Sequence, residues 1–122
     1  MEKRKEFLIL MRTQGDCSVT LEAAVHRTHL QKMMNYIDSL KKQGCLISAQ
    51  PLSMNGSMLQ AKQGTIKDGP FTETKEVIAG YFLIRAKNLN EALEIARKHP
   101  LLEDDPDSRL EIREIKQEEG IN

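Results

Sequence analysis

The sequence predicts an α+β domain of the ferredoxin-like plan, βαβ–hairpin–βαβ, in which two βαβ units share one sheet. The first observation behind this prediction is the order of the segments, which alternates apolar strand-like runs with amphipathic helical ones. The second is the run Val77–Ala86, which is apolar on both faces of an extended chain, as expected for a central strand. At 122 residues the chain fits a single domain, residues 1–122, with a frayed polar tail at 117–122.

The first strand is expected at Phe7–Met11, a continuous apolar run bounded by charged residues and therefore covered on both faces. A polar loop at 13–18 leads to a helix from about Thr20 to Gln43, which Gly44 ends. A separate short first helix that includes residues 23–25 is an alternative for its beginning. The apolar positions of the helix follow a 3.6-residue period and form a stripe of Leu30, Met33, Ile37 and Leu40, with Met34 beside it.

The second strand is expected at Cys45–Ala49, and Pro51 either ends it or marks it as an edge strand. Two short strands, Met58–Ala61 and Gly64–Lys67, predict a small hairpin. A turn is expected to begin at Asp68, because Asp-Gly-Pro combines a residue that tolerates a positive φ with the fixed φ of proline. This turn leads through a charged run into the central strand.

Asn88 and Glu91 fit a capping box that opens the second helix. The positions predicted to be buried in this helix are Leu89, Ala92, Leu93 and Ala96. The proline that follows ends the helix at His99, which is expected to act as a cation at the helix C-terminus. An acidic loop, Leu101–Ser108, then leads to the last strand, Leu110–Ile115.

The two apolar faces of Val77–Ala86 also predict a homodimer. Helices cover one face of a four-stranded sheet, and a monomer would leave the other face in water. A second copy of the sheet is the expected cover, since two-fold dimers are the commonest oligomers.

The balance of charges argues against nucleic acids and membranes as direct partners. The 18 basic and 18 acidic residues cancel, so no direct nucleic-acid binding and no membrane binding are expected. The apolar runs are too short for a signal peptide or a membrane span.

Cys17 and Cys45 form no C-x-x-C pair and are expected to be reduced thiols in a cytoplasmic protein. Since no phosphate loop, nucleophile elbow or metal-ligand cluster is recognisable, no cofactor and no metal are expected.

The segment from Asp68 to Ala96 resembles the signature of the DGPF-domain, YCII-related family. The matching strings are Asp68-Gly69-Pro70-Phe71, Thr74-Lys75-Glu76 and Gly80-Tyr81-Phe82-Leu83-Ile84, with Ala92 and Ala96 in the helix. Residues 110–115 resemble the terminal strand of that family, and the resemblance runs over roughly residues 7–116. The string Asp-Gly-Pro-Phe-x-Glu-x-Lys-Glu is specific, because a chance match at so many positions is very improbable.

The resemblance implies a dimeric α+β barrel of ferredoxin-like subunits. Some YCII-like relatives are small-molecule enzymes with a His–Asp pair in a cleft, including a dehydrochlorinase of chlorinated aromatic degradation. For this chain the resemblance therefore implies a cofactor-independent lyase or isomerase that uses an acid–base pair. DGPF domains are also associated with sigma factors, which implies the alternative of a non-enzymatic binding or regulatory module linked to transcription.

The resemblance assigns the catalytic pair to His29, in a His-Leu context early in the long helix, and to Asp68. The pocket expected around the pair consists of His26, Pro70, Phe71, Lys75, Glu76 and Tyr81. Histidine titrates near neutral pH, so His29 beside a carboxylate could act as a general base, and a half-exposed surface histidine is the alternative.

Each of the other polar candidates also has a structural alternative. Asp68 could be a turn residue that bonds its own backbone, and His26 could be a satisfied core histidine. Lys75 and Glu76 could be a solvated ion pair at the entrance of a strand.

Overall fold

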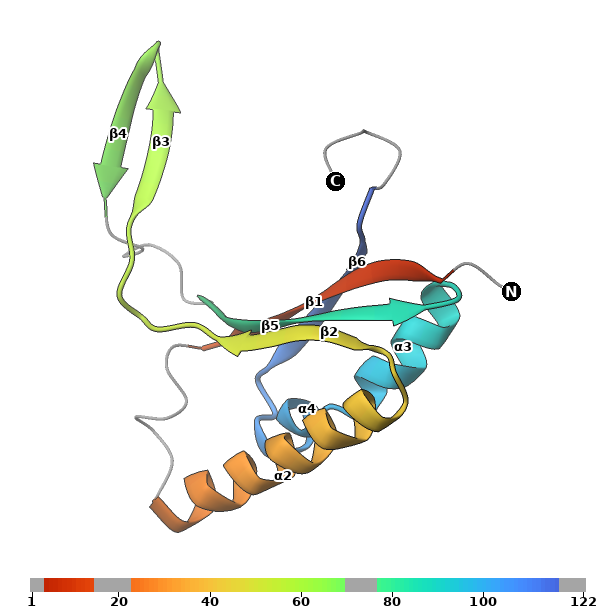
Figure 1. The fold of residues 1–122 in the computed structure, drawn as a ribbon. Coiled ribbons are helices and arrows are strands. Elements are labelled where there is room, and N and C mark those ends of the chain that lie inside the picture. The colour runs from red at the N-terminus through yellow and green to blue at the C-terminus, as the bar shows by residue number, and fades with distance from the viewer. Residues whose placement is uncertain (1–3, 15–22, 70–76, 117–122) are drawn as a thin grey trace.

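The computed structural model describes residues 4–14, 23–69 and 77–116, and it has the predicted α+β, ferredoxin-like architecture (Figure 1). Its elements are β1 (Lys5–Thr13), α2 (Ala23–Lys42), β2 (Leu46–Pro51), β3 (Met58–Lys62), β4 (Thr65–Gly69), β5 (Val77–Ala86), α3 (Leu89–Arg97), α4 (Pro100–Asp104) and β6 (Arg109–Glu114). Four strands form one sheet in the order β2-β5-β1-β6, and β3 and β4 form a separate hairpin. The predicted tail at 117–122 lies outside the described residues.

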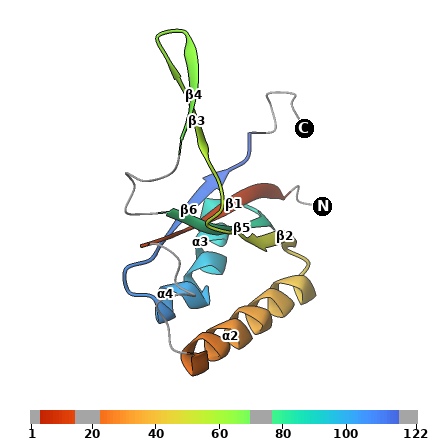
Figure 2. The same ribbon diagram turned by 90° about the vertical axis from the view of Figure 1, so that its left-hand side faces the viewer.

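The helices α2, α3 and α4 lie on one face of the four-stranded sheet, and the hairpin rises from the opposite side (Figures 1 and 2). We call this opposite side the open face. None of the described helices is long and apolar enough to cross a membrane. The order of the sheet and its antiparallel pairings are those of the ferredoxin-like plan, with the hairpin inserted between its two βαβ halves.

The core lies between the sheet and the helices, and it receives alternate side chains from the central strands. Phe7 and Ile9 of β1 and Phe82 and Ile84 of β5 are at most 2% exposed. The residues between them on β1, such as Leu8, are only half-buried. The prediction that this strand is covered on both faces was therefore wrong within one chain, because helices cover one face alone.

A register irregularity near the end of the β1–β5 ladder changes which face Ile78 occupies. Met11 pairs with Gly80, and the next residue of β1, Arg12, pairs with Ile78. The extra residue on β5 moves Ile78, which simple alternation placed on the core side, to the open face, where it is 39% exposed. Gly80 lies where β5 and β2 approach closely, since a Cβ atom there would be 2.9 Å from the carbonyl oxygen of Gln50.

The buried face of α2 is rotated from the predicted stripe. Tyr36 and Leu40 are buried, whereas Leu30 and Met34 are 46% and 61% exposed. The contacts of α2 explain this rotation, because it packs on both α4 and β2 and turns the line of Met33, Tyr36 and Leu40 inward. The described part of α2 begins at Ala23, so residues 15–22 and the exact start of the helix lie outside the described residues.

The second helix is capped as predicted and ends slightly earlier. The backbone N–H of Glu91 donates to the Asn88 side chain at 2.9 Å, and the Glu91 carboxylate accepts from the N–H of Lys87 at 3.3 Å. Ala92 and Ala96 are buried as expected, but Leu89 is 50% exposed. Leu89 belongs to the first turn, which extends beyond the edge of the core.

The segment predicted as an acidic loop begins with a short helix, α4. Pro100 occupies its first turn, where a missing N–H costs nothing, and His99 is its N-cap. Nδ1 of His99 accepts from the N–H of Leu101 at 3.1 Å. The prediction that His99 is a cation at the helix C-terminus was therefore wrong, because capping of α4 and packing bury the ring to 1% exposure.

The β3–β4 hairpin was predicted at nearly its observed position. Gln63 and Gly64 both have positive φ, as expected for a tight two-residue hairpin turn. Asp68 and Gly69 continue β4, where they pair with Leu59 and Met58, so the predicted turn does not begin at Asp68. Residues 70–76, including the rest of that predicted turn, lie outside the described residues.

Candidate functional site

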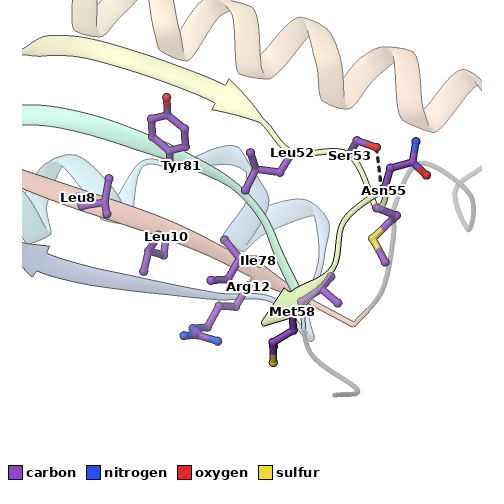
Figure 3. Close-up of a pocket in the computed structure, with 11 residues that line it drawn as sticks. Leu8, Leu10, Arg12, Leu52, Ser53, Asn55, Met58, Ile78 and Tyr81 are labelled. Atoms are coloured by element: carbon purple, nitrogen blue, oxygen red, sulfur yellow. Dashed lines mark hydrogen bonds between the residues drawn. The ribbon is translucent and has the colours of Figure 1, made fainter. Parts of the chain in front are cut away.

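A cavity of about 750 Å³ lies on the open face of the sheet (Figure 3). Side chains from β1, from β5 and from the segment that joins β2 to β3 line it. These residues are Leu8, Leu10, Arg12, Leu52, Ser53, Met54, Asn55, Met58, Val77, Ile78 and Tyr81. Most of them are apolar, so the cavity offers a mainly hydrophobic surface with a few polar groups.

Local backbone geometry builds this cavity at one end of the sheet. The N–H of Leu52 donates to the carbonyl oxygen of Ala79 at 2.8 Å, which holds the chain after β2 against β5. Ser53 accepts from the N–H of Asn55 at 2.9 Å and turns the chain toward the hairpin. The irregularity in β5 brings Ile78 to the same face, so it lies beside Arg12 and below this segment.

Arg12 is the one charged side chain among the described residues that line the cavity. Its Nε donates to Glu111 of β6 at 2.8 Å, and Arg113 donates to the other carboxylate oxygen at 3.2 Å. These two hydrogen bonds lower the pKa of Glu111, Arg12 contributing more than Arg113. The carboxylate therefore stays charged and orients the Arg12 side chain at the side of the cavity.

Tyr81, a predicted pocket residue, lines this cavity from β5. Four other predicted pocket residues, Pro70, Phe71, Lys75 and Glu76, lie outside the described residues.

His29 forms a close pair with Asp104 on the helical side of the sheet. His29 Nδ1 lies 2.7 Å from an oxygen of Asp104, and the two side chains are 11% and 17% exposed. Lys32 donates to the other oxygen of Asp104 at 2.9 Å and to Glu103 at 3.4 Å. Burial raises the pKa of Asp104, but the hydrogen bonds from Lys32 and His29 together outweigh it and lower the pKa below the usual value.

Asp68 lies on β4 of the hairpin, which rises from the open face, whereas His29 lies on α2 under the other face (Figure 1). The sheet therefore separates the two chain segments within one copy, and the carboxylate that contacts His29 in the described structure is Asp104. A contact between His29 of one copy and Asp68 of another stays a prediction.

Two further histidines lie near His29. His26 is half-buried, and its Nδ1 atom is buried without a hydrogen-bond partner in the described structure. His99 packs edge-on against Tyr36 and Phe82, with ring centroids 5.1 and 4.8 Å apart. Burial, and to a smaller extent the neighbouring His29, lower the pKa of His99 to about 4.

Sequence reasoning missed Asp104 and the apolar cavity. The acidic segment that follows α3 was visible, but its pairing with α2 depends on the short helix α4, which was predicted as a loop. Leu52 and Met58 gave no separate signal, since isolated apolar residues near turns are common. Among the described residues no group of three or more acidic, histidine or cysteine side chains is arranged to hold a metal ion.

Comparison with known proteins gives two matches. The family model described as the YCII-related domain matches residues 6–118. An uncharacterised protein from Rhizobium meliloti (strain 1021) is 49% identical over 37 residues. That aligned segment covers 30% of each of the two chains, so the likeness to this relative is local.

Proposed function

The chain belongs to the YCII-related domain family, whose model spans residues 6–118, and we propose that it is a homodimer that binds a small, mainly apolar molecule on the open face of its sheet. One observation carries this proposal, namely the cavity of about 750 Å³ lined by apolar side chains of β1, β5 and the segment after β2. Small-molecule sites in proteins usually measure about 300–1,000 Å³ and combine an apolar lining with a few polar groups.

The polar groups of the cavity indicate the kind of ligand. Arg12 supplies a positive charge, and Tyr81 and Asn55 supply hydrogen-bonding groups, while Leu8 and Leu10 form an apolar floor. A ring or short aliphatic body with one anionic or hydrogen-bond-accepting group matches this arrangement.

The open face also supports the homodimer. On the two central strands, the side chains that alternate with the core residues are apolar and only half-buried. These residues are Leu8, Leu10, Tyr81 and Leu83. Charged residues, among them Arg109 and Arg113, lie at the same face along the edge strand β6. An apolar centre with a charged rim is the usual anatomy of a subunit interface, and a second copy offers the matching surface.

Acid–base catalysis is a second candidate function, and the contact between His29 and Asp104 at 2.7 Å favours it. A carboxylate on Nδ1 orients a histidine ring and leaves Nε2 to accept a proton, as a cofactor-independent lyase or isomerase requires. The pairing of His29 with Asp68 implied by the family resemblance stays a prediction, as does a regulatory role linked to sigma factors. We prefer ligand binding, because the cavity is on the open face and His29 lies on the helical side.

The proposal predicts that a negative charge placed in the cavity weakens ligand binding. The probe is 1-anilinonaphthalene-8-sulfonate, which has an apolar ring system and one anionic group. Leu10→Asp should weaken its binding at least about 10-fold, because the bound probe would have to cover the carboxylate, which is costly, and the carboxylate also repels the sulfonate. The measurement is a fluorescence titration of the folded protein.

Asn90→Asp is the matched control, since it adds the same charge at an exposed position on α3, on the far side of the sheet. It should leave probe binding unchanged. Equal binding by the wild type and Leu10→Asp, with both proteins shown to be folded by cooperative urea unfolding, would contradict the cavity as the binding site.

A further inference from the structure

One face of the β3–β4 hairpin carries three apolar side chains that are in contact with solvent. Its register places Leu59 and Ala61 of β3 on the same face as Ile66 of β4, while Gln60 and Thr65 lie on the other. Leu59 and Ile66 are 70% and 72% exposed. Alternation of apolar and polar residues is the pattern of a strand pair with one buried face, yet here that face is uncovered.

A hairpin of this kind needs a partner. Two isolated strands are marginally stable in water, and they gain independent stability when a third strand or another element packs on them. Exposed apolar strand surfaces also promote aggregation, so folded proteins cover them. The hairpin forms its own sheet, separate from the four-stranded one.

The position of the hairpin favours a second copy of this chain as its cover. The hairpin rises from the open face (Figures 1 and 2), and its first residue, Met58, lines the cavity. Two sheets that pack face to face lie about 10 Å apart, whereas strands of five residues are about 17 Å long. In a face-to-face dimer each hairpin would therefore run past the sheet of the other copy.

The area of the open face points to the same contact. The four strands have 6, 10, 9 and 6 residues, and at about 3.3 Å per residue and a spacing of about 4.8 Å they give a flat footprint of roughly 500 Å². Stable interfaces bury about 800 Å² of accessible surface on each partner. The sheet face alone is thus a small contact, and the apolar hairpin face enlarges it.

We propose that the hairpin of each copy is an arm that packs Leu59, Ala61 and Ile66 onto the other copy and closes the mouth of its cavity. This inference rests on the proposed homodimer. It makes the ligand site composite, because one chain supplies the sheet and the other supplies the cover. Two-fold symmetry then covers both hairpins and both cavities at once.

The test compares two double variants that place the same charges on opposite faces of the hairpin. The first double variant, Leu59→Lys with Ile66→Lys, should raise the dimer dissociation constant by at least about 100-fold. The reason is that a dimer contains two such contacts, and in each of them two charged side chains would replace two apolar ones. Binding of 1-anilinonaphthalene-8-sulfonate should weaken at least about 10-fold. Gln60→Lys with Thr65→Lys should change neither value. Sedimentation equilibrium and fluorescence titration give the two constants.

If the double variant Leu59→Lys with Ile66→Lys dimerises and binds the probe as the wild type does, the arm is overturned. The proposed ligand site on the sheet would then still stand. Loss of the dimer with unchanged probe binding would overturn the closure of the cavity. If the wild type dimerises but does not bind the probe, the closure fails together with the proposed ligand site.

Amide hydrogen exchange of residues 59–66 in the wild type gives a readout that needs no variant. Exchange in the hairpin should slow as the protein concentration rises through the dimer transition. Rates that are fast at every concentration would overturn the arm.

Discussion

Acidification from about pH 6.5 to about pH 4 is expected to destabilise the fold by about 3 kcal/mol through His99 alone. Burial lowers the pKa of this side chain to about 4 in the folded protein, against an ordinary value of 6.5. Between these two values the unfolded chain binds a proton that the folded protein does not. Stability therefore rises with pH across this window and is lost as the pH falls through it.

The cause of this effect is the environment of the ring. Nδ1 accepts a hydrogen bond from the N–H of Leu101, and the ring packs between Tyr36 and Phe82. Nε2 has no hydrogen-bond partner within the described part of the chain. An added proton would remove the acceptor on Nδ1 and place a charge among aromatic rings, near His29.

Urea unfolding at a series of pH values measures this loss. His99→Asn is the matched variant, because its side-chain oxygen can cap α4 but does not titrate. The variant should be less stable at pH 7, yet its stability should change little between pH 6.5 and 4.5. A wild type and variant with parallel stability profiles would show that His99 is not the titrating group.

Replacing Phe82 by alanine is expected to destabilise the fold by about 3–5 kcal/mol. Phe82 is 2% exposed, lies on the central strand β5, and contacts the rings of Tyr36 and His99. Its loss leaves a cavity at the junction of the sheet, α2 and α4, which these packed elements cannot close without moving. Chemical denaturation measures the free energy of unfolding.

Arg85→Ala is the control for Phe82→Ala, since Arg85 is exposed on the same strand. It should change the free energy of unfolding by no more than about 0.5 kcal/mol. A cost of less than about 1 kcal/mol for Phe82→Ala would contradict the central place of this ring in the core.

Much of the fold could be predicted because its signals are local. Three of these signals act over a few residues each. They are the capping residues Asn88 and Glu91, the glycine at 44 with a φ of +72°, and the alternation of side chains along Val77–Ala86. The face of α2 could not be predicted with the same accuracy. Leu30 and Met34 fit an apolar period as well as Tyr36 does, and the positions of α4 and β2 decide which side is buried.

The candidate site could be predicted only in part, because it depends on contacts between distant segments. Tyr81 was expected in a pocket and lines the cavity, but Leu52 and Met58 reach it through the path of the chain after β2. The partner of His29 is 75 residues away, and it comes into reach through α4. Sequence spacing carries no information about such a pairing.

Methyl NMR of the wild-type protein during titration with 1-anilinonaphthalene-8-sulfonate tests most directly whether the open face is the functional surface. The ring of the probe should shift the methyl resonances of Leu8, Leu10 and Ile78, which line the cavity. Shifts confined to Leu30 of α2 and Leu102 of α4, on the helices that carry His29 and Asp104, would contradict the account. They would instead place ligand binding at the acid–base pair on the helical side of the sheet.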